Sequence, residues 1–275
     1  MKKKVKYKVV GLILLLCAFI YIFPLYLLFI NSFKSYQEIL TNPYFFPKNW
    51  IFENIKEVLT KSTFLKSMRN SIISTSISVS VIVIFSSMAS YSLIRRKGKL
   101  NPILYIFFMA GVLIPFQTYM IPLVKELNVL RILRKPLALF ITYIAQYTPL
   151  SVFIYSGYIR TVPKEVEEAA IVDGAGPYRI FFRIIFPLIS PCTASVIIIF
   201  SILIWNSFVQ PIVILGTLRW RTLFVELLTY IQDRYFQQWN MTFATCLISV
   251  LPISIIYIIW QNRIISGLTS GAVKY

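Results

Sequence analysis

The dominant feature of the chain is a series of six long apolar stretches separated by polar segments. A helix needs roughly 20 apolar residues to cross the hydrocarbon core of a bilayer, and each stretch is long enough. Backbone groups in lipid must be hydrogen-bonded within their own segment, so these stretches predict helices. The predicted spans are residues 9–33, 71–94, 102–124, 136–158, 184–209 and 241–261. The predicted fold class is an all-α integral membrane protein with six transmembrane helices in one domain over residues 1–275.

The basic residues between the spans indicate an orientation. The first eight residues include five lysines, and residues 95–99 include four basic residues. Because cytoplasmic loops are enriched in Lys and Arg, we expect both termini in the cytoplasm. The first apolar run is too long for a cleavable signal peptide, so we expect it to stay as a helix. Residues 159–183 then form a cytoplasmic loop, and residues 34–70 and 210–240 form long extracellular loops.

Composition narrows the function classes. Apolar residues make up 57% of the chain and charged residues 14%, which favours a membrane protein over a soluble one. The formal charge of +18 is spread over the polar gaps without a basic stripe, so we expect no nucleic-acid partner. The chain has no histidine, and Cys17, Cys192 and Cys246 are isolated from one another. This argues against histidine catalysis, metal clusters and a disulfide framework.

The predicted spans contain no charged residue. Proton-coupled carriers usually hold ionisable groups inside the membrane, so proton coupling through side chains is disfavoured. Sodium coupling stays open, because unwound backbone can hold that ion. The sequence has no phosphate-binding loop of the Gly-x-x-x-x-Gly-Lys-Ser/Thr type, so energy for uphill transport would come from a partner. The serines of the second span are most simply small packing residues.

The loop between the fourth and fifth spans has the most informative pattern. Pro163 suits the first turn of a helix, and the glutamates within residues 165–168 lie near the positive end of that helix. Ala169 and Ala170 favour helix and have thin side chains that let a partner approach. Gly174 can take the backbone angles of a sharp turn, and a proline three residues later starts a second helix. Two interpretations explain this pattern equally well: a solvent-exposed helix with capped ends, and a helix that docks on a partner.

The order of residues in this loop resembles the EAA loop of ATP-binding cassette (ABC) importer permeases. The family pattern is glutamate-Ala-Ala, three positions, glycine, nine positions, then Ile-x-Leu-Pro. This chain has Glu168-Ala169-Ala170, Gly174 and Ile184-x-Phe186-Pro187 in the same register, with Phe186 replacing leucine. Residues 70–71, 89–93, 121–123 and 205–208 extend the resemblance to the carbohydrate-uptake branch, whose members are similar to the shorter maltose-importer permease.

The resemblance implies a type I ABC importer permease fold in a bacterial cell membrane, with a helix–turn–helix coupling loop on the cytoplasmic face. It implies three partners: a second permease subunit, an ABC ATPase dimer that binds ATP and magnesium, and an extracellular sugar-binding lipoprotein or periplasmic protein. This chain itself would hold no cofactor and catalyse no reaction.

The matching positions carry expected roles in coupling. Glu168 would make a charge-assisted contact to the ATPase, and Ala169 and Ala170 would pack closely against it. Gly174 would form the turn, and Asp173 is either a cap of the second turn or an ordinary turn residue.

Sugars are bound through aromatic faces and neutral hydrogen-bonding groups. The spans and their ends offer such side chains for a substrate path: Gln117, Tyr119, Gln146, Tyr147 and Asn206. Each of them could instead serve helix–helix contacts or the interfacial aromatic belt.

Three rival interpretations remain at this stage. An ion-coupled secondary transporter would work without an ATPase, but it leaves the register of residues 168–187 unexplained. A membrane-embedded enzyme would need a nucleophile or metal cluster facing the interior, and it has little support because no span contains a histidine or a carboxylate. A structural scaffold would bind no ATPase.

Overall fold

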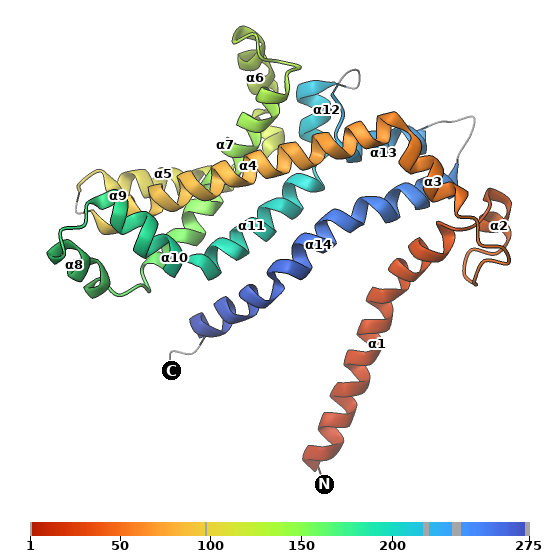
Figure 1. The fold of residues 1–275 in the computed structure, drawn as a ribbon, viewed down its shortest axis with the longest axis horizontal. Helices are drawn as coiled ribbons and strands as arrows, with labels where there is room; N and C mark the ends of the chain where they lie inside the picture. The colour runs from red at the N-terminus through yellow and green to blue at the C-terminus, as the bar shows by residue number, and fades with distance from the viewer. Residues whose placement is uncertain (1, 97, 217–219, 233–237, 273–275) are drawn as a thin grey trace. The chain divides into compact units, whose positions relative to one another are not determined.

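The computed structural model describes residues 2–96, 98–216, 220–232 and 238–272. Every regular element within these ranges is helical, which confirms the predicted all-α class. The described chain divides into two compact units. Unit 1 comprises Met1–Lys66 and Glu226–Pro252, and unit 2 comprises Ser67–Val225 and Ile253–Tyr275. Two long helices, α4 (Ser62–Arg95) and α14 (Trp239–Ala272), contribute to both units (Figure 1).

Within the described residues, four continuous helices are long and apolar enough to span a membrane. These segments are Val10–Asn31, Thr63–Arg95, Pro136–Ile159 and Trp239–Ile259. Two further pairs of helices pass the same test together but are sharply bent at a short break. Counting each bent pair as one crossing gives six spans.

The first bent pair covers the predicted span 102–124. Helix α5 (Asn101–Leu113) and helix α6 (Phe116–Val129) meet at 103°. The residue before a proline is restricted to extended backbone, and Ile114 before Pro115 has φ −89° and ψ 109°. The apolar run is therefore continuous in sequence although the helix is not.

The second bent pair covers the predicted span 184–209. A helical segment from Pro177 to Leu188 precedes α11 (Ser190–Trp205), and the bend between them is 75°. The segment consists of α9 (Pro177–Ile180), the π-helical turn η1 (Phe181–Ile185) and α10 (Phe186–Leu188). Pro191 has no N–H to donate to the carbonyl four residues earlier, which interrupts the helical ladder at this point.

The predicted outer loops contain helices of their own. Residues 34–70 include α2 (Tyr36–Thr41), α3 (Glu53–Thr60) and the first turns of α4. The described parts of residues 210–240 include α12 (Val209–Leu215) and α13 (Leu223–Gln232). Residues 217–219 and 233–237 of that loop lie outside the described chain.

In unit 1, buried polar groups tie the outer segment to the end of α1 (Lys2–Asn31). Lys34 is fully buried, and its Nζ donates to Asn31 Oδ1 (3.0 Å) and to the carbonyl of Asn42 (2.8 Å). Asn54 Nδ2 donates to the carbonyl of Lys34 (2.9 Å), and Asn240 Nδ2 donates to Asn54 Oδ1 (3.0 Å). The segment is therefore packed structure rather than a free linker.

In unit 2, α7 (Pro136–Ile159) is the central helix, because α5, α11 and α12 all pack against it. Its Tyr143 and Tyr155 are fully buried, as is Phe200 of α11. The hydroxyl-rich side of α4 is also buried, and Ser90 Oγ donates to the carbonyl of Val152 in α7 (3.1 Å). Small side chains on α4 thus allow close packing in unit 2, in line with the sequence interpretation of its serines.

Candidate functional site

The element with the coupling-loop sequence is a short helix, α8 (Glu165–Val172), followed by a tight turn and α9. Three glutamates occupy the first turn of α8, where the helix dipole favours negative charge. The helix ends in a Schellman motif: the N–H of Gly174 bonds to the carbonyl of Ile171 (3.0 Å) and that of Ala175 to the carbonyl of Ala170 (2.9 Å). Gly174 has φ +74°, a left-handed conformation that suits glycine.

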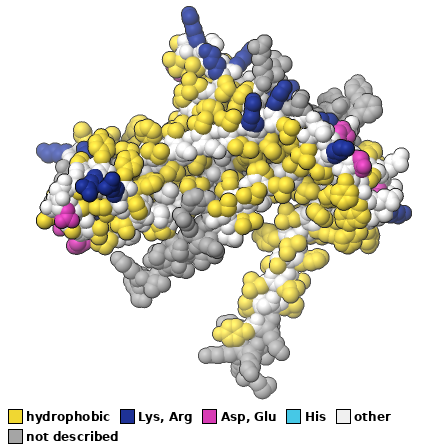
Figure 2. Space-filling view, in the orientation of Figure 1, with side chains coloured by type: hydrophobic (Ala, Val, Ile, Leu, Met, Phe, Trp, Pro, Cys, Tyr) yellow, Lys and Arg dark blue, Asp and Glu magenta, His cyan; other side chains and the backbone are white. Residues whose placement is uncertain are grey.

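One face of α8 is exposed and presents predicted site residues. Glu168, Ala169, Asp173 and Gly174 are exposed, and Asp173 ends α8 as its C-cap through a backbone bond to the carbonyl of Ala169 (3.1 Å). In unit 2, acidic and basic side chains gather at the end that carries α8 (Figure 2). The exposed face offers the carboxylates of Glu168 and Asp173 beside the small side chain of Ala169, a surface that a partner can approach closely.

Ala170 lies on the opposite, inward face of α8. It is buried and belongs to the same hydrophobic cluster as Val162 and Ile180. The structure thus separates the two alanines of the motif: Ala169 faces outward and Ala170 packs inside unit 2.

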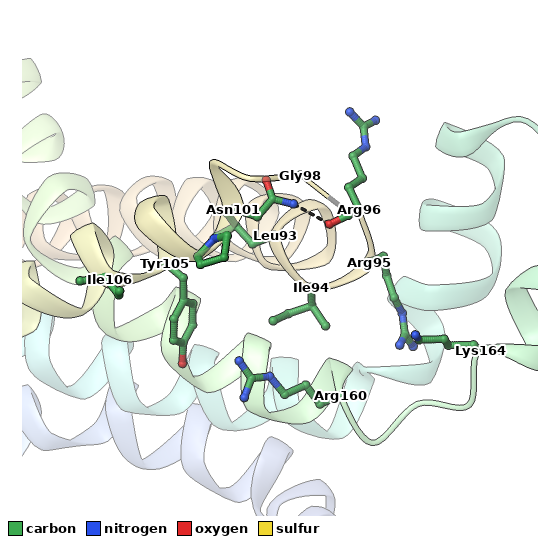
Figure 3. A pocket seen from close by; sticks show the side chains of 11 residues that line it. Leu93, Ile94, Arg95, Arg96, Gly98, Asn101, Tyr105, Ile106, Arg160 and Lys164 are labelled. Carbon is green, nitrogen blue, oxygen red and sulfur yellow. Dashed lines mark hydrogen bonds between the residues drawn. The ribbon is translucent and has the colours of Figure 1, made fainter.

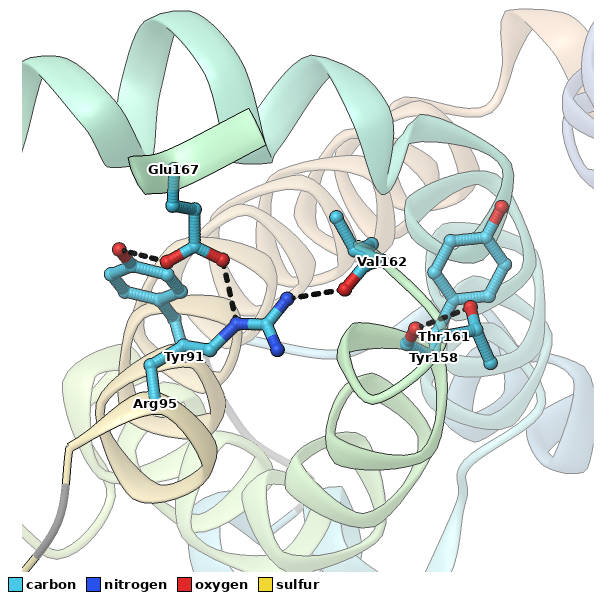
Figure 4. Close-up of polar contacts among 6 residues, drawn as sticks. All are labelled: Tyr91, Arg95, Tyr158, Thr161, Val162 and Glu167. Carbon is cyan, nitrogen blue, oxygen red and sulfur yellow. Dashed lines mark hydrogen bonds and ion pairs between the residues drawn. The ribbon is translucent and has the colours of Figure 1, made fainter. Parts of the chain in front are cut away.

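Glu167, next to the predicted Glu168, holds α8 against the end of α4. Its carboxylate forms an ion pair with Arg95 Nε (2.6 Å) and accepts a hydrogen bond from the Tyr91 hydroxyl (2.9 Å), as Figure 4 shows. Arg95 also donates through Nη2 to the carbonyl of Val162 (2.6 Å), just before α8. Tyr91 further contacts the ring of Phe181, with centroids 5.5 Å apart. A buried polar cluster therefore joins a candidate span to the loop.

Sequence reasoning missed this cluster. Arg95 contributed only to the count of basic residues, and Glu167 only to the acidic first turn of a helix. The available signal was the four-residue spacing of Tyr91 and Arg95, which places both side chains on one face at the end of a helix.

Two of the five predicted substrate-path residues lie together between α7, α11 and α12. Gln146 Oε1 accepts from Gln210 Nε2 (3.1 Å), and Gln210 Oε1 accepts from Ser207 Oγ (2.8 Å). Ser207 in turn accepts from the Tyr143 hydroxyl (2.9 Å). The ring of Tyr147 lies against those of Tyr143 (6.3 Å) and Phe200 (5.5 Å).

The other three candidates are placed differently. Gln117 is exposed on α6, and Tyr119 packs edge-on against Phe116 of the same helix, with centroids 5.4 Å apart. Asn206 is exposed at the C-terminus of α11.

A cavity of about 360 Å³ lies between α4, α11 and α14 in unit 2. Its polar lining consists of hydroxyl groups, from Thr75, Ser76, Ser80 and Ser201. Thr75, Ser76 and Ser80 of α4 therefore line a cavity, whereas Ser90 of the same helix packs against α7. Among the described residues, no group of three or more His, Cys, Asp or Glu side chains could hold a metal ion.

Comparison with known proteins identifies the family. Residues 82–270 match the family described as "Binding-protein-dependent transport system inner membrane component". The chain belongs to this family. The family is one of membrane permease subunits, so the predicted resemblance and the assignment as a transport component rather than an enzyme are confirmed.

Individual relatives match over nearly the whole chain. The probable starch degradation products transport system permease protein AmyC of Thermoanaerobacterium thermosulfurigenes is 34% identical over 93% of this chain and 92% of its own. The melibiose/raffinose/stachyose import permease protein MelC of Bacillus subtilis is 34% identical over 97% and 96%. A chain of a bacterial ABC transporter involved in alginate import has the same fold, with a TM-score of 0.85, 20% identity, and coverage of 95% and 98%. The type I importer permease fold is thereby confirmed for this permease.

Proposed function

We propose that the chain is one of two permease subunits that form the translocation path of an ABC importer for a sugar or oligosaccharide. An extracellular binding protein would deliver the sugar, and a cytoplasmic ATPase dimer would bind ATP and magnesium. The relatives named for starch products and for melibiose, raffinose and stachyose support a carbohydrate substrate. The observation that carries the coupling role is α8, with an exposed Glu168 and Ala169 on one face and a buried Glu167 on the other.

In this proposal, α8 docks on the ATPase and transmits its movement to the spans. Closure of the ATPase dimer on ATP would displace α8, and the Arg95–Glu167 ion pair would pass that displacement to α4. The permease would then switch between inward-facing and outward-facing states, as a two-state element biased by a ligand bound elsewhere. Glu168 would supply the charge-assisted contact, Ala169 the close approach and Gly174 the turn.

We further propose that each bent helix pair crosses the membrane once, which gives six spans with both termini in the cytoplasm. The end of unit 2 that carries α8 would then face the cytoplasm. For the substrate path we propose the neutral polar groups of Gln146 and Tyr147, because sugars are bound by such groups together with aromatic faces.

Cross-linking tests the docking role directly. Ala169→Cys places a thiol on the exposed face of α8, and Val129→Cys places a matched thiol on exposed α6 of the same unit. In membranes containing all subunits, a short bifunctional cross-linker should join the ATPase to the first thiol and not to the second. Absence of an ATPase adduct at residue 169 would overturn the docking role.

Reconstitution tests the function as a whole. The chain should be purified with its natural partner subunits, and ATP hydrolysis measured with empty and sugar-loaded binding protein. We expect stimulation by the loaded protein. Sugar uptake by this chain alone without ATP would instead establish a secondary transporter, and stimulation by a non-carbohydrate ligand would overturn the substrate class.

A further inference from the structure

A cavity of about 630 Å³ lies in unit 2 where α4 and α7 end and α5 begins (Figure 3). Small-molecule sites in proteins usually enclose about 300–1,000 Å³, so this cavity has the size of a ligand site. It is separate from Gln146 and Tyr147, which we propose for the substrate path, because neither residue lines it.

The lining of the cavity has a cationic part and an apolar part. Arg95, Arg160 and Lys164 bring three cations to it, while Ile94 and Ile106 supply apolar surface. Among the described residues that line it, none is acidic. The side chain of Arg96, which also belongs to the lining, extends away from the others in Figure 3.

Two of the three cations are not neutralised by a carboxylate. Glu167 compensates the charge of Arg95, as described above. Arg160 lies over the ring of Tyr105, with 5.4 Å between the guanidinium carbon and the ring centroid, and Lys164 is exposed. Within the described chain, neither Arg160 nor Lys164 has an acidic partner within ion-pair distance. The cavity therefore has an excess of positive charge, which favours an anionic ligand.

The position of the cavity indicates the source of that anion. The candidate spans Thr63–Arg95 and Pro136–Ile159 both end at it, and the end of a span is where the hydrocarbon core gives way to the lipid headgroups. Basic pockets between transmembrane helices at this depth suit anionic lipid headgroups. A soluble phosphate would satisfy only the cations, whereas a phospholipid also covers the apolar part with its glycerol and first acyl carbons.

We propose that this cavity binds the phosphodiester of an anionic phospholipid, with Arg160 and Lys164 contacting the phosphate. The headgroup would lie beside Lys164, the residue that directly precedes α8. This inference goes beyond the transport function and does not depend on docking of an ATPase.

Native mass spectrometry of the full chain in detergent tests the proposal. Phosphatidylglycerol and phosphatidylcholine with the same acyl chains should be titrated against the wild type and Arg160→Gln/Lys164→Gln. Each cation near an anionic headgroup contributes about a fivefold affinity gain, so the double variant should bind phosphatidylglycerol about 30-fold more weakly. Phosphatidylcholine has the same phosphodiester, but its choline cation offsets the charge, so it should bind the wild type more weakly and lose a smaller factor in the double variant.

The matched control is Lys99→Gln/Arg183→Gln, which removes two exposed cations of unit 2 that do not line the cavity. It should keep wild-type affinity for phosphatidylglycerol. If Arg160→Gln/Lys164→Gln cannot be purified in folded form, Lys164→Gln alone should show about a fivefold loss. Unchanged phosphatidylglycerol affinity in the folded variant, or an equal loss in the control, would overturn the proposal. Displacement of the lipid by equimolar glycerol 3-phosphate would assign the cavity to soluble phosphate instead.

Discussion

The two adjacent glutamates at the start of α8 allow one test of how the loop is held. Glu167→Gln removes the charge that pairs with Arg95 at 2.6 Å, while both side chains are about one-tenth exposed (10% and 9%). Removing one partner of a buried ion pair costs about 3–5 kcal/mol. Arg95 keeps its hydrogen bond to the carbonyl of Val162, and some solvent reaches the pair. We therefore expect α8 to lose about 2–3 kcal/mol of its stability against local opening.

This loss corresponds to roughly a 30- to 150-fold increase in the opening equilibrium. Hydrogen exchange of the α8 amides, followed by mass spectrometry of peptides covering residues 165–180, measures it directly. Glu168→Gln is the control, because Glu168 is exposed and its loss should leave exchange near the wild-type rate. Glu168→Gln should instead weaken binding of the ATPase, while leaving the stability of α8 unchanged.

A double-mutant cycle completes this test. Arg95→Gln combined with Glu167→Gln should destabilise α8 by less than the sum of the single changes, since neither charge is then left unpaired. Wild-type exchange in Glu167→Gln would refute the assignment of this pair as the anchor of α8.

Four further predictions concern Gly174, Tyr143 and Lys34. Gly174→Ala should lower the unfolding free energy by about 1 kcal/mol. The loss comes from backbone strain alone, because the added Cβ would meet no atom within 4 Å. Gly174→Asp should insert into the membrane normally but uncouple ATP hydrolysis from sugar uptake, and normal uptake by this variant would contradict the role of the turn. Tyr143→Phe should cost about 1–2 kcal/mol in a denaturation assay through loss of its bond to Ser207, with Tyr147→Phe as the control, and equal effects of the two would contradict it. Burial lowers the pKa of Lys34 below 10.5, so the unfolded chain binds more protons between the lowered value and 10.5. Stability should therefore rise with pH in that window for the wild type, and the same slope in Lys34→Met would contradict the assignment.

The acidic first turn of α8 and the glycine turn after it could be predicted because their causes are local: the glutamates and the glycine with positive φ act through neighbouring backbone groups. The expectation that Pro163 lies in the first turn is wrong, because α8 begins at Glu165 with Lys164 as its N-cap. Bilayer thickness sets only the minimum length of a span, and the helix predicted over residues 71–94 extends to cover Thr63–Arg95.

The bend near Pro115 shows where a pattern of hydrophobic residues fails. Residues 102–124 satisfy the length and hydropathy of a span, so the average over this window hides a single pre-proline residue. The geometry of Ile114 nevertheless turns the chain by 103° between α5 and α6. The backbone restriction at one residue before proline therefore breaks the helix, although the composition of the whole segment favours a continuous span.

The choice between Glu167 and Glu168 could not be made from the sequence. Neighbouring residues on a helix point about 100° apart, so one of them faces inward once the helix docks. Which one does so depends on where Arg95 lies, and Arg95 is more than seventy positions away in the chain. The resemblance to a known loop directed attention to Glu168, which is exposed, but it carried no information about Glu167.

The placement of the anchor explains how a short loop could move a long helix. Ser90, Tyr91 and Arg95 lie within two turns at the end of α4. Ser90 contacts α7, whereas Tyr91 and Arg95 both contact Glu167 of α8, and Tyr91 also packs against Phe181. A load applied to α8 would reach α4 through a charged contact that resists separation, whereas the hydroxyl contact of Ser90 with α7 is single and neutral. If α4 moves with α8, Ser90 is therefore the contact expected to yield first. Ser90→Ala should then make the switch easier while Arg95→Gln makes it harder, and opposite shifts in ATPase stimulation would distinguish a transmitted movement from a general loss of stability.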